Sequence, residues 1–499
     1  MDVPAAPAVD PRSGRPLKWY QGLDRYCWVV LVISALGWLF DTMDQNLFNL
    51  VRVPSLKELL HPHPGDLKKP LTDAEKEKLA ADVRQIGPVI TAIFIVGWAT
   101  GGWLFGILGD RLGRTKTMIA TILIYAIFTG ASGLVGMWGL PRSWILYAAL
   151  RFLTGLGVGG EWAAGASLVA ETFPARSRPM ALGLLQALSS VGNMMAALVI
   201  ICLSSVIPEE DQATSWRWAY FVGFVPALLC LWIRRSVKEP PQWHEAREKA
   251  SVGKEMGNIG QLFSHPVLRR NTISAVLMAT AGVGALWGIG FFSTDMIRGK
   301  LNTQAQVLEK ELPDKAVRAL KLKEAGLDEQ GIGKKVGVMF LLQNAGSFFG
   351  IYLFAMFSER FNRRKAFLLW FVLAWASVLA FFWGVSGASE GAYRAALVLA
   401  VVMGFCTLGP FSGFTIHFPY LFPTRLRTTG AGFCYNVARY LAAVAPFILG
   451  GLSNRMGGLA PAATVLSFVY ILGFVGVFMS PETKGRPLPE DKDFETAAV

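Results

Sequence analysis

Several long stretches of the chain contain no ionised residue, and these stretches constrain the fold more than any other feature. A helix needs about 20 consecutive apolar residues to cross the hydrocarbon core of a bilayer, which is about 30 Å thick. Eight stretches reach this length: 85–109, 117–141, 179–208, 271–294, 336–358, 366–389, 395–424 and 456–481. With 53% hydrophobic and only 17% charged residues, the chain is also too apolar for an ordinary soluble protein. The sequence therefore predicts a membrane protein.

Four further segments are apolar but are either short or interrupted by charge. They are 27–50 with two aspartates, 144–170 with an arginine and a glutamate, 428–450 with an arginine, and the short segment 218–233. Added to the eight charge-free stretches, they bring the number of predicted spans to twelve. We therefore expect an all-α membrane protein with twelve transmembrane helices.

The positions of Lys and Arg predict the orientation of the chain. The formal net charge is +13, but the basic residues lie mostly in loops, which argues against a nucleic-acid partner. Short loops on one side carry most of them, whereas the opposite short loops hold Arg142 and Arg455. Both termini are therefore expected in the cytoplasm, with the chain in the plasma membrane or, in a prokaryote, the inner membrane. Residues 1–26 lack the apolar core of a cleavable signal peptide, and long outer loops are expected at 51–84 and 295–335.

An internal repeat divides the chain into two halves. GILGDRLGRTK at 106–116 aligns with AMFSERFNRRK at 355–365 under a shift of 249 residues. Two parallel halves related by an axis along the membrane normal are typical of one class of secondary transporter. The same shift aligns other pairs: Gly97 with Gly346, Gly101 with Gly350, Pro174 with Pro423, and Arg178 with Arg427.

The repeat predicts five consecutive regions. These are a cytoplasmic tail at 1–26, a six-helix bundle at 27–233, a cytoplasmic connector at 234–270, a second six-helix bundle at 271–481 and a cytoplasmic tail at 482–499. All five cysteines fall in predicted spans, so we interpret them as buried hydrophobic residues rather than as disulfides or metal ligands. No metal or cofactor is expected, and a monomer is the expected state.

The strip at 106–116 resembles the signature of the major facilitator superfamily. RFLTGLGVGGEW at 151–162, ETFPARSR at 171–178, WRW at 216–218 and PETKG at 481–485 are similar to its sugar-porter and metabolite-symporter branches. The resemblance covers nearly the whole chain and implies two pseudo-symmetric six-helix bundles. It also implies that the strip is a cytoplasmic latch, which forms and breaks as the two halves move.

The residues expected in the latch are Gly106, Asp110, Arg111, Gly113 and Arg114 in the first copy, and Glu359, Arg360 and Arg363 in the second. The glycines are expected to let the second and third spans approach closely. Asp110 is expected at the N-terminus of a neighbouring helix, and the arginines at lipid phosphates or an acidic partner. Tyr420 replaces Glu171 in the second copy, which predicts a weaker latch there. A merely solvated basic loop is the alternative.

Charged residues inside a span cost about 2.5–3.5 kcal/mol each near the helix centre, so each one needs a reason. Asp41 and Asp44 lie three residues apart in the first span and therefore on one face. Arg151 of the fourth span lies at a depth similar to that of Asp44, so the two side chains can pair. The resemblance implies that they are the proton-coupling pair. A static structural salt bridge between the two spans is the alternative.

Glu161 lies about 15 Å along the helix from Arg151 and is not its direct partner. We interpret Glu161 as a second titrating site, with Asp41 tuning or relaying the proton. A buried acid satisfied by backbone or water is the alternative. The DxxD pattern at 41–44 resembles that of aromatic-acid and sialate or lactate proton symporters, which points away from sugars.

Arg439 of the eleventh span resembles the arginine that holds the substrate carboxylate in organic-anion transporters. A planar guanidinium matches the geometry of a carboxylate. Pairing with one of the buried acids is the alternative. Four amide residues are further candidates for substrate binding: Asn436, Gln343, Asn344 and Gln186. For these amides, hydrogen bonding between helices is the more ordinary role.

The sequence excludes several classes of protein. It contains no phosphate-binding GxxxxGK[ST] motif, no HExxH, no GxSxG and no paired CxxC, so neither an enzyme nor an ATP-driven pump is expected. We predict a proton-coupled importer of a small organic anion that works by alternating access between the halves, with the substrate, protons and the lipid bilayer as its partners. A proton-coupled sugar or polyol symporter is the second possibility, and a non-transporting sensor of the same fold is the third.

Overall fold

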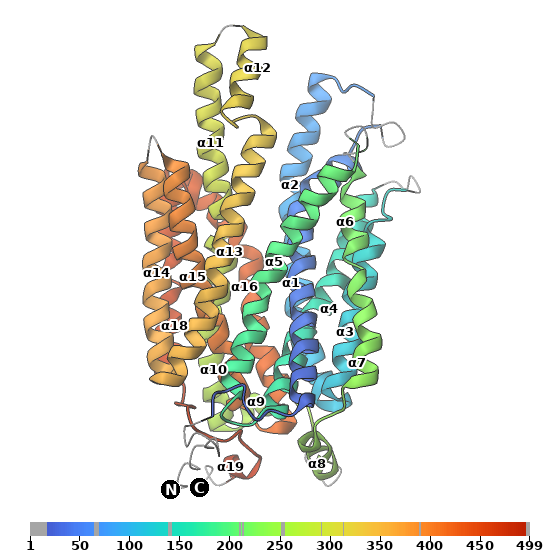
Figure 1. The fold of residues 1–499 in the computed structure, drawn as a ribbon, viewed down its shortest axis with the longest axis vertical. Coiled ribbons are helices and arrows are strands. Elements are labelled where there is room, and N and C mark those ends of the chain that lie inside the picture. The colour runs from blue at the N-terminus through green and yellow to red at the C-terminus, as the bar shows by residue number, and fades with distance from the viewer. Residues whose placement is uncertain are drawn as a thin grey trace.

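The computed structural model describes residues 17–63, 69–137, 142–208, 211, 214–250, 255–290, 292–312, 314–388 and 391–495. These residues fold into helices joined by short connections, and none of them forms a strand. Figure 1 shows two upright bundles side by side, the first coloured blue to green and the second yellow to red. The prediction of an all-α fold with two bundles is confirmed.

The N-terminal half contains α1 (Arg25–Leu59), α2 (Asp73–Leu112), α3 (Arg114–Ser132), α4 (Ser143–Thr172), α5 (Arg178–Val206), and a sixth span made of α6 (Trp216–Val222), η2 (Val225–Leu228) and α7 (Leu229–Ser236). The connector contains α8 (Pro241–Ala250) and α9 (Gln261–Ser264). The six spans of this half follow the ranges predicted from the sequence.

The C-terminal half begins with α10 (Pro266–Ala279), which continues into two π-helical turns, η3 (Thr280–Gly284) and η4 (Leu286–Gly290). It goes on through α11 (Phe292–Glu311), α12 (Lys315–Glu324), α13 (Glu329–Arg360), α14 (Arg363–Gly387), α15 (Ala392–His417), η5 (Phe418–Tyr420), η6 (Thr424–Leu426), α16 (Arg427–Met456), α17 (Leu459–Ser467), α18 (Tyr470–Met479) and α19 (Lys492–Glu495). Nine helices in the described part of the chain are long and apolar enough to cross a membrane. The charged α4 and two interrupted segments, α6–α7 and α10–η4, supply the remaining three spans.

The two ends of the molecule differ. We call one the α8 end, because α8, α9, α19 and the start of α1 lie there, and the other the α12 end (Figure 1). At the α12 end the predicted long loops are largely helical, which corrects the expectation for 51–84 and 295–335. The start of α2 is stabilised by a capping box, in which Thr72 Oγ1 accepts from Glu75 N at 3.4 Å and Glu75 Oε2 accepts from Thr72 N at 2.8 Å. Polar sequence here therefore extends the helices rather than ending them.

Glycines aligned by the repeat allow close packing within each half. A Cβ atom on Gly101 of α2 would collide with the carbonyl oxygen of Leu156 of α4. A Cβ atom on Gly350 of α13 would collide in the same way with Phe405 of α15. Each repeated glycine therefore serves the same helix pair in its own bundle.

Candidate functional site

Arg439 lies at the interface between the two halves, about midway along α16. Its Nη1 donates hydrogen bonds to the carbonyl of Tyr435 at 2.9 Å and to Asn436 Oδ1 at 2.8 Å. The guanidinium lies 4.2 Å from the ring centre of Trp98 in α2 and 4.4 Å from that of Tyr435. The residue is only 2% exposed, its Nε has no hydrogen-bond partner, and it forms no ion pair with any described residue. A permanent positive charge is thus held between aromatic rings without a counter-ion.

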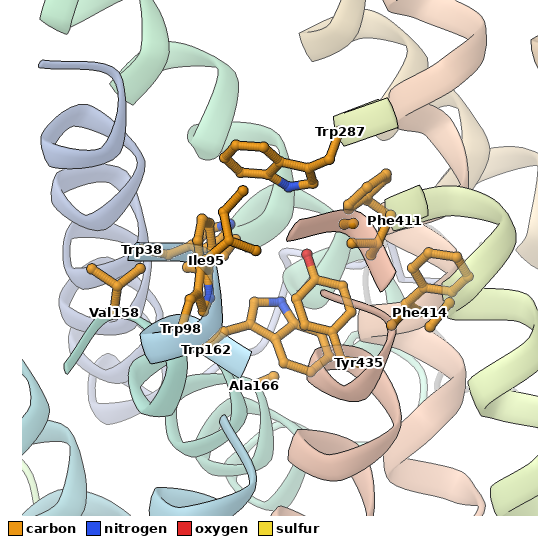
Figure 2. Close-up of a cluster of buried hydrophobic side chains, with 14 of the residues drawn as sticks. Trp38, Ile95, Trp98, Val158, Trp162, Ala166, Trp287, Phe411, Phe414 and Tyr435 are labelled. Atoms are coloured by element: carbon orange, nitrogen blue, oxygen red, sulfur yellow. The ribbon is translucent and has the colours of Figure 1, made fainter. Parts of the chain in front are cut away.

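Aromatic side chains from both halves gather in one buried cluster (Figure 2), and two of them, Trp98 and Tyr435, contact this arginine. Trp162 of α4 stacks on Tyr435 of α16 with 3.8 Å between ring centres and 18° between ring planes. Trp98 meets Trp287, in the second π-helical turn, edge to face at 5.8 Å. Figure 2 also places Phe411 and Phe414 of α15 in the same cluster. Trp98 and Tyr435 thus place apolar rings beside one cation inside a buried aromatic cluster.

Gln186 and Asn436 lie beside the aromatic cluster, and their role in substrate binding stays a prediction. Gln186 Oε1 accepts from Trp162 Nε1 at 3.0 Å and from Thr415 Oγ1 of the other half at 2.9 Å. Asn436 accepts from Arg439, and its amide nitrogen donates to the carbonyl of Gly432 at 2.8 Å. Both amides therefore orient residues that contact or flank Arg439.

Asn344 and Gln343 lie on α13, farther toward the α12 end. A chain of amides joins the halves there: Asn46 donates to Asn193 at 2.6 Å, and Asn193 donates to Asn344 at 2.7 Å. Gln343 Oε1 accepts from Ser293 within its own half at 3.4 Å. Asn193 is not among the amides named from the sequence, and only its hydrogen bonds to Asn46 and Asn344 distinguish it from other polar residues of its span.

Asp44 and Arg151 are neighbours inside the N-terminal half and are both 0% exposed. They do not form an ion pair, and both carboxylate oxygens of Asp44 lack a hydrogen-bond partner. Arg151 Nη2 instead donates to Ser132 Oγ at 2.7 Å, and its guanidinium lies 4.6 Å from the ring of Tyr220. Asp44 and Arg151 therefore lie at similar depths, as expected, but α3 and α6 supply the closest contacts of Arg151.

Asp41 and Glu161 also lie buried without hydrogen-bond partners for their carboxylate oxygens. The Glu161 carboxylate lies against Gly37 of α1, and a side chain at that position would collide with it. Asp41 interacts electrostatically with Glu161, Asp44 and, across the interface, Arg439. The three predicted acids therefore form one buried group in the N-terminal half.

The predicted latch of the first copy joins the halves at the α8 end. Asp110 accepts from the backbone N–H groups of Thr428 at 3.2 Å and Thr429 at 2.8 Å, at the N-terminus of α16. Arg114 Nη2 lies 3.1 Å from Asp110 Oδ1 and 3.0 Å from Glu171 Oε1. That same glutamate oxygen lies 2.7 Å from Nη1 of Arg427, which belongs to the other half. Asp110 is thus at the N-terminus of a neighbouring helix, and Arg114 has an acidic partner, as expected.

The role expected for the latch glycines needs correction. Gly106 lies against Thr428 of α16, where an added Cβ would come within 2.9 Å of the carbonyl oxygen. Gly106 therefore permits contact between the halves rather than between the second and third spans. Gly113 forms the turn itself, with φ of 112°. Arg111 is exposed, and its Nε donates to the Met256 carbonyl of the connector at 3.0 Å.

The second copy of the latch has a different chemistry. Arg363 lies 4.2 Å from the ring centre of Tyr420, and Arg178 Nη1 donates to the Tyr420 hydroxyl at 3.1 Å. The shift of 249 residues aligns this trio with Arg114, Glu171 and Arg427. A neutral phenol therefore occupies the place of the central carboxylate.

Glu359, the counterpart of Asp110, does not cap the other half. Its only ion pair among the described residues is with Arg363 on its own helix, at 3.6 Å. The position that aligns with Thr428 is Pro179, which has no N–H to donate. Arg360 lies exposed at the end of α13.

Two glutamates missed by the sequence analysis cap the helices that follow each strip. Glu239 accepts from Arg114 N at 2.8 Å and from Thr115 N at 3.0 Å. Glu482 accepts from Arg364 N at 3.0 Å and from Arg363 N at 3.3 Å. Glu239 lies in KEPP directly after the sixth span, and Glu482 lies in PETKG directly after the twelfth. This equivalent position in the two halves is the sequence signal that could have identified them.

Comparison with characterised proteins places this geometry among transporters. The chain is 29% identical to a probable 4-methylmuconolactone transporter of Cupriavidus pinatubonensis over 449 residues. The alignment covers 90% of this chain and 89% of the relative. The chain is 25% identical over 441 residues to the sialic acid transporter of Escherichia coli, covering 88% and 90%. These relatives are transporters of small metabolites and not enzymes.

Solved structures show the same fold. The proton:xylose symporter XylE bound to 6-bromo-6-deoxy-D-glucose superposes with a TM-score of 0.68 at 15% identity, covering 95% of this chain and 99% of that one. A sequence model described as "Sugar (and other) transporter" matches residues 322–492. The model of the Major Facilitator Superfamily matches residues 34–305, more than half of the chain. The chain is therefore a member of the Major Facilitator Superfamily and a transporter of small metabolites.

Proposed function

We propose that this transporter takes up a small organic anion together with a proton, by alternating access between its two halves. The observation that carries the proposal is the state of Arg439. A buried guanidinium without a counter-ion is costly unless a partner reaches it, and a carboxylate matches its planar geometry. The aromatic rings around it supply apolar contact for the rest of the anion.

Contacts at the α8 end support the alternating-access part of the proposal. The buried ion pair between Glu171 and Arg427 and the cap that Asp110 provides to α16 hold the halves together there. Hydrogen bonds between the halves continue through the centre as far as Asn344 and Tyr440, which bonds Thr100 at 2.9 Å. Transport then requires these contacts to break when the α8 end opens. The Lys and Arg of the short loops on this side favour a cytoplasmic location for the α8 end.

The buried acids support coupling to protons. Asp44, Asp41 and Glu161 are buried, and their carboxylate oxygens have no hydrogen-bond partner among the described residues, so none of the three is committed to a structural ion pair. Asp41 interacts electrostatically with Arg439 without forming an ion pair, so protonation of Asp41 removes a negative charge that competes with a substrate carboxylate for the arginine. One proton entering down a potential of 100 mV supplies about 2.3 kcal/mol. That energy sustains roughly a fifty-fold concentration ratio.

The named relatives are consistent with an organic substrate of this kind, since one is described as a transporter of a muconolactone and another of sialic acid. A neutral sugar or polyol is the second candidate. The fold similarity to a xylose symporter and the amides Gln186 and Asn436 beside aromatic rings favour it. A sensor that does not transport would have no need for the unpaired charges.

The test is uptake by proteoliposomes under an imposed pH gradient. Labelled benzoate, muconate and sialate are offered in parallel with xylose. We expect at least one carboxylate to accumulate, and we expect Arg439→Gln to abolish that uptake while Arg439→Lys retains part of it. Arg455→Gln, an exposed arginine on the same helix, is the matched control. Accumulation of xylose alone, or normal carboxylate uptake by Arg439→Gln, would refute the anion assignment.

A further inference from the structure

Arg52 of α1 is a basic residue that the proposed mechanism does not use. Its Nη1 donates to Thr91 Oγ1 of α2 at 2.5 Å, and Thr91 donates in turn to the carbonyl of Gly87 at 3.0 Å. The guanidinium thus uses one of its N–H groups among the described residues, and its Nε has no hydrogen-bond partner. Arg52 is only partly buried. The Arg52 guanidinium is therefore held through Nη1 alone, and its other N–H groups have no hydrogen-bond partner among the described residues.

The contacts of α2 place Arg52 and Arg439 along one line. Thr91, which holds Arg52, and Trp98, which contacts Arg439, are seven residues apart on α2. Seven residues are two helical turns, so the two contacts lie on one face about 10 Å apart along the axis. Because α2 starts at the α12 end, Arg52 lies nearer that end and Arg439 lies deeper (Figure 1).

An acid of the other half interacts with Arg52. Asp295, near the start of α11, interacts with it electrostatically but forms no ion pair with it among the described residues. Asp295 is exposed, and it also interacts with Arg298 one turn farther along α11. Arg52 therefore lies within electrostatic reach of the second half and has no ion-pair partner in the part of the chain that the structure describes.

We propose that Arg52 and Thr91 form an outer anion subsite, which receives the carboxylate of the substrate from the α12 end before Arg439 does. The proposal rests on the anion transport proposed above and adds a second binding position to it. A partly buried guanidinium with unused donors attracts anions over a distance and binds carboxylates in a planar geometry. Because Arg52 lies about 10 Å closer to the α12 end than Arg439, an anion entering from that end would reach Arg52 first.

The experiment measures initial rates of benzoate, muconate and sialate uptake from the α12 face by the full chain in proteoliposomes, at low and at high salt. Arg52→Gln is expected to raise KM about tenfold and to leave Vmax unchanged. The dependence of KM on salt is expected to weaken, because a screened charge has been removed. Arg52→Lys is expected to keep most of the wild-type KM.

Two variants separate the subsite from a structural role. Arg84→Gln removes the same charge from an exposed position on α2 and is expected to leave KM unchanged. Thr91→Val removes the hydrogen bond but keeps the guanidinium, and is expected to have a smaller effect than Arg52→Gln. If Thr91→Val and Arg52→Gln instead lower Vmax and thermal stability equally, Arg52 merely holds α1 against α2 and the proposal is wrong.

Asp295 provides a further test, because its charge opposes an incoming anion. Asp295→Asn is expected to lower KM or leave it unchanged. Loss of Vmax in both Arg52→Gln and Asp295→Asn, restored by combining Arg52→Asp with Asp295→Arg, would make the pair a closing contact and overturn the subsite. A wild-type KM in Arg52→Gln would also overturn the outer subsite. If carboxylate uptake still requires Arg439 in that case, the proposed function stands. Uptake of xylose alone would overturn both.

Discussion

Asp110 of the N-terminal half caps a helix of the C-terminal half through Thr429. Its Oδ2 accepts from Thr429 N at 2.8 Å and from Thr429 Oγ1 at 2.7 Å. The negative charge lies where the backbone N–H groups of α16 and the helix dipole favour an anion. Separation of the halves at the α8 end has to break this cap.

Asp110→Asn is therefore expected to destabilise the state closed at the α8 end by about 1 kcal/mol. The amide keeps one acceptor but loses the charge that pairs with Arg114. The measurement is the rate at which an impermeant thiol reagent labels a cysteine introduced beside Thr428, and labelling should become faster. Glu359→Gln is the matched control, because Glu359 caps no helix of the other half. Equal labelling of the two variants would contradict the role of Asp110.

Tyr420→Glu is expected to slow opening of the α8 end. The new carboxylate would lie between Arg178 and Arg363, as Glu171 lies between Arg427 and Arg114. Each new charge-assisted hydrogen bond adds roughly 1.5–3 kcal/mol. Thermal stability should rise and the turnover rate in counterflow should fall. Tyr420→Gln, which adds polarity without charge, should do neither. An unchanged turnover rate in Tyr420→Glu would show that the second copy does not limit opening.

Asp44→Asn is expected to separate binding from energy coupling. The asparagine cannot exchange a proton, so exchange of labelled for unlabelled substrate should continue while accumulation driven by a pH gradient is lost. Asp24→Asn, an exposed acid just before α1, should retain both activities. Full accumulation by Asp44→Asn together with normal counterflow would remove Asp44 from the coupling mechanism.

Asn193 and Asn344 are expected to couple energetically across the interface. A double-mutant cycle of their alanine variants, read from free energies of unfolding, should give about 0.5–1.5 kcal/mol for the 2.7 Å hydrogen bond. Asn193→Ala combined with Asn436→Ala should be additive, because no hydrogen bond joins those two residues. A coupling energy near zero between Asn193 and Asn344 would mean that water replaces the bond at little cost.

Local sequence patterns were enough to predict the spans, the repeat and the charged residues that are buried. These follow from local properties: the length of apolar runs, the spacing of Asp41 and Asp44, and the recurrence of one strip at a constant shift. Helical structure within the outer segments 51–84 and 295–335 was not predicted, and at the start of α2 it depends on the capping pair Thr72 and Glu75.

Only the tertiary structure decided which groups meet. Gly106 borders the opposite half, Glu239 caps α3 from more than 100 residues away, and Arg151 turns to Ser132 and Tyr220 rather than to Asp44. The hydrogen bond from Asn193 to Asn344 could not be predicted either, because it forms only where α5 packs against α13. A membrane span is selected by its own hydrophobicity, whereas hydrogen bonds and ion pairs between spans depend on packing angles and depths that no single segment encodes.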